Sequence, residues 1–142
     1  MSNNLTFTSG IFGQITNFAP ADTTTTKTVL TADATYMRRI YAIAVYSSDT
    51  SARDIIININ DGTNTRKLST VSIPANSGNT NAIVTLDLFA NGQLLAFFSK
   101  NRDSQGVPYY NIPIGYSITM SMGSTITASK EVNVYVYGES YN

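Results

Sequence analysis

The sequence predicts an all-β protein, an antiparallel β-sandwich or jelly roll of about seven to nine short strands. Stretches rich in Val, Ile, Thr and Tyr alternate with the turn-forming residues Gly, Pro, Asn and Asp. No stretch longer than about two turns has the apolar periodicity of a helix. The 142 residues are 42% hydrophobic but only 13% charged, so Thr, Ser and Asn must form the polar face. A barrel is the less favoured alternative.

The clearest predicted strand is 40–48, which is apolar on both faces, as is typical of a central strand. Residues 54–60 predict a second strand. The dipeptide Asp61-Gly62 then supplies the positive φ of a two-residue hairpin. Residues 27–31 and part of 36–39 predict two further short strands.

The stretch 66–73 alternates between apolar and polar residues. Its expected inward set is Leu68, Val71 and Ile73. Pro74 ends this strand, because proline cannot donate a hydrogen bond to a sheet.

The middle of the chain is less regular. Residues 83–88 alternate imperfectly and fit either a strand or a short helical turn, and 94–98 are the most apolar run. We expect 101–106 to form a polar loop. Residues 108–115 contain two prolines and predict an extended connector.

Two stretches near the end alternate cleanly, 116–122 and 131–137. Gly123 closes the first, and we expect Gly138 to end the second. The residues predicted to point inward are Ile118, Met120, Met122, Val132, Val134 and Val136.

The first 26 residues differ from the rest, because Gly and Pro interrupt their apolar side chains. They predict an extra edge strand of the sandwich, an arm that docks on another subunit through Phe7, Phe12 and Phe18, or a disordered leader. In the arm hypothesis, residues 27–142 form the globular domain by themselves.

Histidine and cysteine are both absent from the sequence. The chain therefore lacks the side chain that titrates near neutral pH and the thiolate nucleophile, which are also the commonest metal ligands. We expect no enzymatic activity, no catalytic residues, no metal site and no cofactor.

Charge and patterning limit the partners as well. The net charge is zero and the pI is about 6.1, so no overall field attracts nucleic acid or an anionic membrane. No apolar run reaches the roughly 18 residues of a membrane helix. The start lacks a basic region followed by an apolar one, so we expect no signal peptide.

Two polar clusters favour local structure over chemistry. Asn58, Asn60, Asp61 and Asn64 surround a glycine, but the bidentate Glu of a calcium loop is missing, so a plain turn is favoured. Asp49 and Asp54, near Arg53, occupy turn-type positions where Asp bonds the nearby backbone, so we expect no catalytic pair.

Aromatic residues suggest contact surfaces. Arg38 and Arg39 lie near Tyr36 and Tyr41, but neighbours in a strand point to opposite faces, so only one arginine can join any one surface. A solvated or subunit-contact arginine is favoured over a nucleic-acid site.

Four tyrosines form a second candidate surface: Tyr109, Tyr110, Tyr135 and Tyr137. They predict either a protein interface, which we favour, or an aromatic platform for a sugar ring.

The order of several segments resembles capsid decoration proteins (auxiliary or cement proteins) of tailed bacteriophages. These segments are KTVLTA (27–32), IAVYSSDTSARD (43–54), TVSIPANSG (70–78), NIPIG (111–115), TASKEV (127–132) and GESY (138–141). The resemblance spans about residues 23–142. It implies a β-sandwich or jelly-roll subunit, often trimeric, bound to the outside of an icosahedral head assembled in the host cytoplasm. The family carries no catalytic residues.

The expected function is therefore that of a structural virion protein whose partners are the major capsid protein and further copies of itself, as a homotrimer. Two alternatives remain open. One is another phage structural role, such as a head-fibre base or a tail-associated protein. The other is a carbohydrate-binding β-sandwich module.

Overall fold

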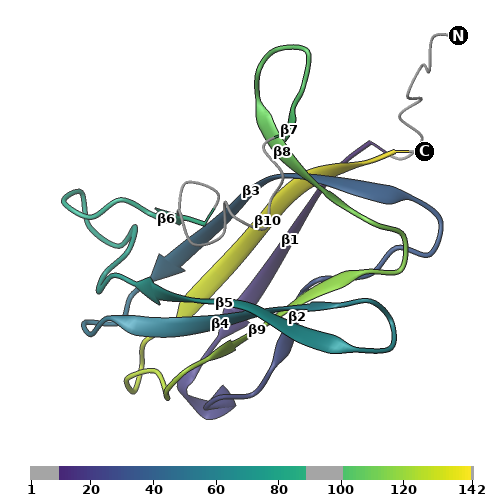
Figure 1. Ribbon diagram of the computed structural model, residues 1–142. Helices are drawn as coiled ribbons and strands as arrows, with labels where there is room; N and C mark the ends of the chain where they lie inside the picture. The colour runs from purple at the N-terminus through teal and green to yellow at the C-terminus, as the bar shows by residue number, and fades with distance from the viewer. Residues whose placement is uncertain (1–9, 89–100, 142) are drawn as a thin grey trace, which may run out of the picture.

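The protein is an all-β sandwich, as predicted. The computed structural model describes residues 10–88 and 101–141, which form two antiparallel sheets (Figure 1). The strands are β1 (Gly10–Phe18), β2 (Lys27–Leu30), β3 (Met37–Ser47), β4 (Arg53–Asn60), β5 (Thr65–Ile73), β6 (Leu86–Asp87), β7 (Asn101–Arg102), β8 (Pro108–Ile112), β9 (Ser117–Met122) and β10 (Val132–Tyr141). Within the described ranges, the 3-10 turn η1 (Pro20–Asp22) is the one helical element.

The strand order is that of a jelly roll. One sheet has the order β1-β10-β3-β8-β7, with β6 also paired to β3, and the other has the order β2-β9-β4-β5. Leaving aside the two-residue strands β6 and β7, the first strand pairs with the last, β2 with β9, β3 with β8, and β4 with β5. This nested pairing is what results when one long antiparallel ribbon is folded in half and wound into two sheets.

The core lies between the two sheets and is formed by alternate residues of the strands. All six residues expected to point inward from β9 and β10 are buried. The largest fully buried side chains are Phe18, Leu30, Ile40, Ile43, Ile55, Ile57, Ile73, Leu88, Ile112, Ile118 and Met120.

The predicted central strand is confirmed, and it is longer than expected because residues 37–39 belong to it. Strand β3 has β10 on one side and both β6 and β8 on the other. Ile43, Val45 and Ser47 are buried, whereas Ala42, Ala44 and Tyr46 on the other face are half-buried. The second apolar face therefore forms part of an outer surface.

A β-bulge explains how Leu68, Val71 and Ile73 of β5 can all face inward. Leu68 and Val71 are three positions apart, so strict alternation would place them on opposite faces. The register skips Leu68, since Ile57 pairs with Ser69 and Asn58 with Lys67. The extra residue resets the alternation, so that Leu68 packs against the core and Val71 is buried.

The expected two-residue hairpin between β4 and β5 is wrong. Asn60 pairs with Thr65, which leaves a loop of residues 61–64. The Asp61 carboxylate accepts hydrogen bonds from the backbone N–H groups of Thr63 and Asn64, at 2.9 and 2.7 Å. This local bonding stabilises the longer loop, in which Gly62 has the expected positive φ of 95°.

Two further expectations fail around β8 and β10. Residues 108–112 are a strand paired with β3 and β7 rather than a connector. Gly138 does not end the last strand, which continues to Tyr141 past a bulge in β3, where Tyr41 is the extra residue. Residues 86–87 form strand β6, and the apolar run 94–98 lies outside the described residues.

The N-terminal segment forms an edge strand over residues 10–18. Strand β1 pairs with β10 in a continuous register from Gly10–Ser140 to Phe18–Val132. Phe18 is fully buried and Phe12 packs against the core, so neither is an anchor on the outer surface of this subunit. Phe7 lies outside the described residues.

Gly138 should be the least replaceable glycine of the sheet. A Cβ at this position would overlap the carbonyl oxygen of Arg39 and would touch the Phe12 ring. We expect Gly138→Ala to destabilise the fold by about 1–3 kcal/mol, because the backbone of β3 would have to move.

The matched control is Gly13→Ala, whose Cβ would meet only the partly exposed Tyr135 side chain, which can rotate away. Urea denaturation of both variants measures the difference. Equal stability of the two variants would contradict the close approach of β3 and β10.

Candidate binding surface

The outer face of the six-stranded sheet is rich in tyrosine because of the alternation in β10. Val132, Val134 and Val136 point into the core. The intervening positions therefore point outward, and the alternation continues through the bulge. These outward residues are Asn133, Tyr135, Tyr137, Glu139 and Tyr141.

Neighbouring strands add side chains to the same face. Arg39 of β3 pairs with Glu139 on one side and with Asn111 of β8 on the other. The Tyr141 hydroxyl donates a hydrogen bond to Asn111 Oδ1 at 2.6 Å. This bond links β10 to β8 across the intervening strand β3.

Arg39 is held by aromatic rings and by one carboxylate. Its guanidinium carbon lies 4.0 Å from the ring centre of Tyr109 and 4.9 Å from that of Tyr141. Its Nη1 is 3.6 Å from Glu139 Oε1. Cation–π attraction and the ion pair together offset the cost of burying a side chain that is only 8% exposed.

Tyr41 completes this cluster. Its hydroxyl donates a hydrogen bond to Glu139 Oε1 at 2.6 Å, and its ring lies 6.3 Å from Tyr109 and 6.4 Å from Tyr137. Burial, reinforced by the hydrogen bond to the carboxylate, raises the pKa of Tyr41 above its usual value. Tyr41 therefore stays a protonated donor at neutral pH.

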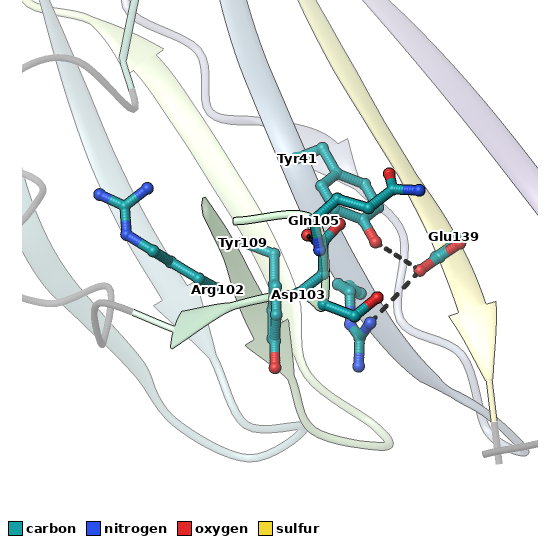
Figure 2. A pocket seen from close by; sticks show the side chains of 8 residues that line it. Tyr41, Arg102, Asp103, Gln105, Tyr109 and Glu139 are labelled. Carbon is teal, nitrogen blue, oxygen red and sulfur yellow. Dashed lines mark hydrogen bonds and ion pairs between the residues drawn. The ribbon is translucent and has the colours of Figure 1, made fainter. Parts of the chain in front are cut away.

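A pocket opens beside this cluster. The β7–β8 hairpin extends beyond the sheet (Figure 1), and side chains from its turn face those of β3, β8 and β10 (Figure 2). The space has a volume of about 450 Å³. Its lining residues are Arg39, Tyr41, Arg102, Asp103, Ser104, Gln105, Tyr109 and Glu139.

The predicted tyrosine platform is partly correct. Tyr109, Tyr135 and Tyr137 share the outer face, but Tyr110 pairs with Ile40 and packs against the core, so it faces inward. The sequence placed Tyr41 beside Arg39 but did not join it to the other tyrosines, and sequence reasoning missed Glu139 and Tyr141. The two-residue spacing from Tyr135 onward is the signal for Glu139 and Tyr141, but Gly138 predicts a strand end before them.

The two adjacent arginines point to opposite faces, as predicted. Arg39 joins the tyrosines, whereas the guanidinium carbon of Arg38 lies 4.7 Å from the centre of the Phe12 ring. The Nη2 atom of Arg38 lies 3.5 Å from Asp33 Oδ2. Its Nη1 donates a hydrogen bond to the Thr31 carbonyl oxygen at 2.6 Å. Arg38 thus connects β3 with β1 and with the segment after β2.

An apolar strip lies at the other end of the outer face. Ile11 and Ile15 of β1 are 70% and 71% exposed, and the neighbouring Tyr135 is 39% exposed. Gly13 lies between the two isoleucines, beneath the Tyr135 ring. We call Ile11, Ile15 and Tyr135 the β1 strip.

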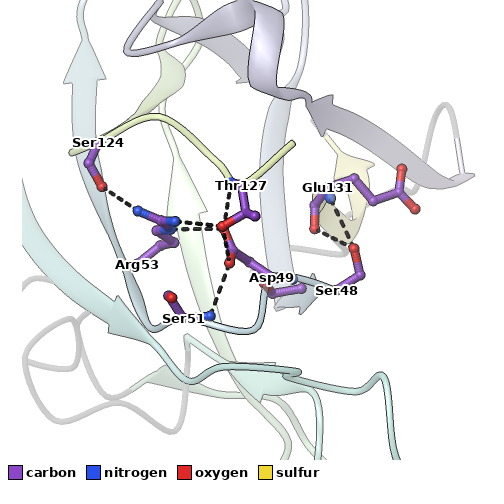
Figure 3. A network of polar contacts seen from close by, with 8 residues as sticks. Ser48, Asp49, Ser51, Arg53, Ser124, Thr127 and Glu131 are labelled. Atoms are coloured by element: carbon purple, nitrogen blue, oxygen red, sulfur yellow. Dashed lines mark hydrogen bonds and ion pairs between the residues drawn. The ribbon is translucent and has the colours of Figure 1, made fainter. Parts of the chain in front are cut away.

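The buried carboxylate of Asp49 organises a separate polar network (Figure 3). It accepts hydrogen bonds from Arg53 Nε at 2.8 Å and from the Thr127 backbone N–H at 2.9 Å. The Ser51 N–H and the Thr127 hydroxyl also donate to it, at 3.0 and 2.9 Å. Arg53 in turn donates to Ser124 and Thr127, so one carboxylate joins the β3–β4 turn to the segment before β10.

This network is built for stability. Burial alone would raise the pKa of Asp49, but the hydrogen bonds from Thr127, Arg53 and Ser51 outweigh it and hold the pKa well below its usual range. Asp54, the other carboxylate of the candidate pair, is exposed on β4.

The other residues singled out in the sequence have structural roles. The Asn58–Asn64 cluster is the β4–β5 turn, and Met120 and Met122 are core residues. Among the described residues, no group of three or more acidic side chains could hold a metal ion. The described part of the chain contains no helix that is long and apolar enough to cross a membrane.

No model of a known protein family matches this chain, and no curated protein matches it either. The resemblance to decoration proteins therefore stays a prediction.

Asp49 should make stability depend on pH. The pKa of Asp49 is lower in the folded than in the unfolded chain. The ionised carboxylate therefore contributes fully to the free energy of unfolding above the unfolded pKa of about 3.9, and this contribution is lost as the pH falls below that pKa. We expect Asp49→Asn to lower the free energy of unfolding by about 3 kcal/mol at pH 7 and to flatten its decline between about pH 5 and 2.

Denaturant titrations at pH 7, 5 and 3 measure both effects. The exposed Asp54→Asn is the control and should change stability by no more than about 0.5 kcal/mol. A wild-type pH profile for Asp49→Asn would show that the network does not stabilise the fold.

Proposed function

We propose that this chain is a structural protein of a bacteriophage virion, which binds the outer surface of the capsid and stabilises or decorates the head. Its partners would be the major capsid protein and further copies of itself, arranged as a trimer. The observation that carries the proposal is the β1 strip, an exposed apolar surface on an uncharged edge strand of a jelly roll.

Edge strands are usually protected against association by charge. Strand β5, one of the two edges of the other sheet, carries Arg66 and Lys67 at exposed positions. Strand β1 has no charged residue among its nine, and it exposes two isoleucines. Such an edge is suited to contact with another protein, because burying the strip there removes apolar surface from water.

Zero net charge supports the same role. A decoration protein must bridge shell subunits through many modest contacts that symmetry repeats. Copies of a neutral chain do not repel one another, and closed rotational symmetry is the usual arrangement of identical subunits. The order of segments that resembles decoration proteins points to the outside of the head as the location. Assembly in the reducing host cytoplasm fits a chain without cysteine.

The test uses heads of the phage that encodes this chain, assembled without it. Purified wild-type protein should bind these heads, with occupancy measured by sedimentation and cryo-EM. Replacing both Ile11 and Ile15 by Asp should reduce the affinity at least tenfold, because each buried isoleucine contributes about 1.5–3 kcal/mol.

The matched control is Val84→Asp, which charges an apolar side chain that is 82% exposed but lies far along the chain from β1. All variants should retain the wild-type thermal transition. Failure of the wild type to bind the heads would overturn the proposed function. Normal binding of the double variant would overturn the assignment of the contact to the β1 strip.

A further inference from the structure

The pocket under the β7–β8 hairpin is lined by positive and negative side chains in equal number. Glu139 pairs with Arg39 and accepts a hydrogen bond from Tyr41. Arg102 donates to the Gly106 carbonyl oxygen at 2.8 Å. Among the described lining residues two arginines thus face one aspartate and one glutamate, which gives them no net charge. A ligand needs no charge of its own to enter.

The turn of the hairpin supplies polar atoms in a fixed geometry. Asp103 Oδ1 accepts hydrogen bonds from the backbone N–H groups of Gln105 and Val107, both at 2.9 Å. The carboxylate is thereby oriented, while its second oxygen keeps acceptor capacity. The exposed Gln105 adds both a donor and an acceptor. Carboxylate, amide and guanidinium groups bind two neighbouring hydroxyls at once, as a sugar ring presents them.

Aromatic rings form the opposite wall. Tyr41 and Tyr109 lie edge to face, with an angle of 67° between their planes, and both line the pocket. The electron-rich face of a tyrosine ring attracts weakly positive C–H groups, such as those on one face of a pyranose.

The lining argues against other ligand classes. Among the described residues that line it there is no aliphatic side chain, which disfavours a lipid or another wholly apolar molecule. A phosphate or other anion would meet the carboxylates of Asp103 and Glu139. The volume of about 450 Å³ lies within the roughly 300–1,000 Å³ typical of small-molecule sites.

We propose that this pocket binds an uncharged pyranose unit of an oligosaccharide, with Tyr41 and Tyr109 contacting the ring and Asp103 and Gln105 binding its hydroxyls. The site goes beyond the proposed virion role and does not depend on it. The described residues that line it come from β3, β7, β8, β10 and the β7–β8 turn and include none of β1, although Glu139 is the strand partner of Ile11. A soluble subunit suffices for the test.

The experiment is NMR titration of the full chain with maltotriose, laminaritriose, chitotriose and mannotriose, and with sialyllactose as a charged comparison. At least one neutral sugar should shift the ring signals of Tyr41 and Tyr109. Gln105→Ala should weaken that binding about fivefold to tenfold, as expected for the loss of one hydrogen bond.

The control is Thr63→Ala, which changes an exposed loop residue of the separate β4–β5 hairpin and should leave binding unchanged. Tyr109→Phe retains the ring that stacks on Arg39 and should keep the fold and most of the affinity. Binding to none of the neutral sugars, binding of sialyllactose alone, or equal affinity of Gln105→Ala and wild type would each overturn the proposal. If the protein fails to bind phage heads, the sugar titration still stands, so the two proposals are tested separately.

Discussion

The pairing of β10 with β3 is the constraint on which the rest of the structure depends. It places the last strand beside the central one and sets which side chains face the core. If the pairing register of β10 with β3 shifted by one residue, the valines of β10 would face solvent and its tyrosines would face the core. The register also changes at Gly138, where the backbone of β3 approaches too closely for any Cβ. That single glycine lets the strand continue to Tyr141 and so brings Glu139 beside Arg39.

The opposite end of the sandwich is held by polar groups rather than apolar packing. Asp49 is fully buried, and each of its carboxylate oxygens accepts hydrogen bonds from more than one donor. Ser77, which is also buried, donates to the Val45 carbonyl oxygen and accepts from the Leu86 N–H. Turns cannot bury their backbone groups without such partners. The chain thus uses short polar side chains to connect its loops where disulfides are absent.

The outer face of the six-stranded sheet presents two chemically different surfaces. At β1 it exposes isoleucine and tyrosine without charge, which suits a permanent contact with another protein. At β7 and β8 it forms a polar pocket with aromatic walls, which suits a small hydroxyl-rich ligand. The two surfaces meet on β10, where Glu139 lines the pocket and pairs with Ile11 of β1.

The amino-acid sequence by itself determined the fold class, most strands and the inward faces of β9 and β10, because alternation is local and follows from the two-residue repeat of a strand. It also predicted that Arg38 and Arg39 separate. Only the tertiary structure decided which strands pair, that residues 108–112 join the sheet, and that Gly138 lies within a strand. Only the tertiary structure could bring Tyr41, Tyr109 and Glu139 together. These depend on contacts between residues as far apart in the chain as Gly10 and Ser140, which no local pattern records.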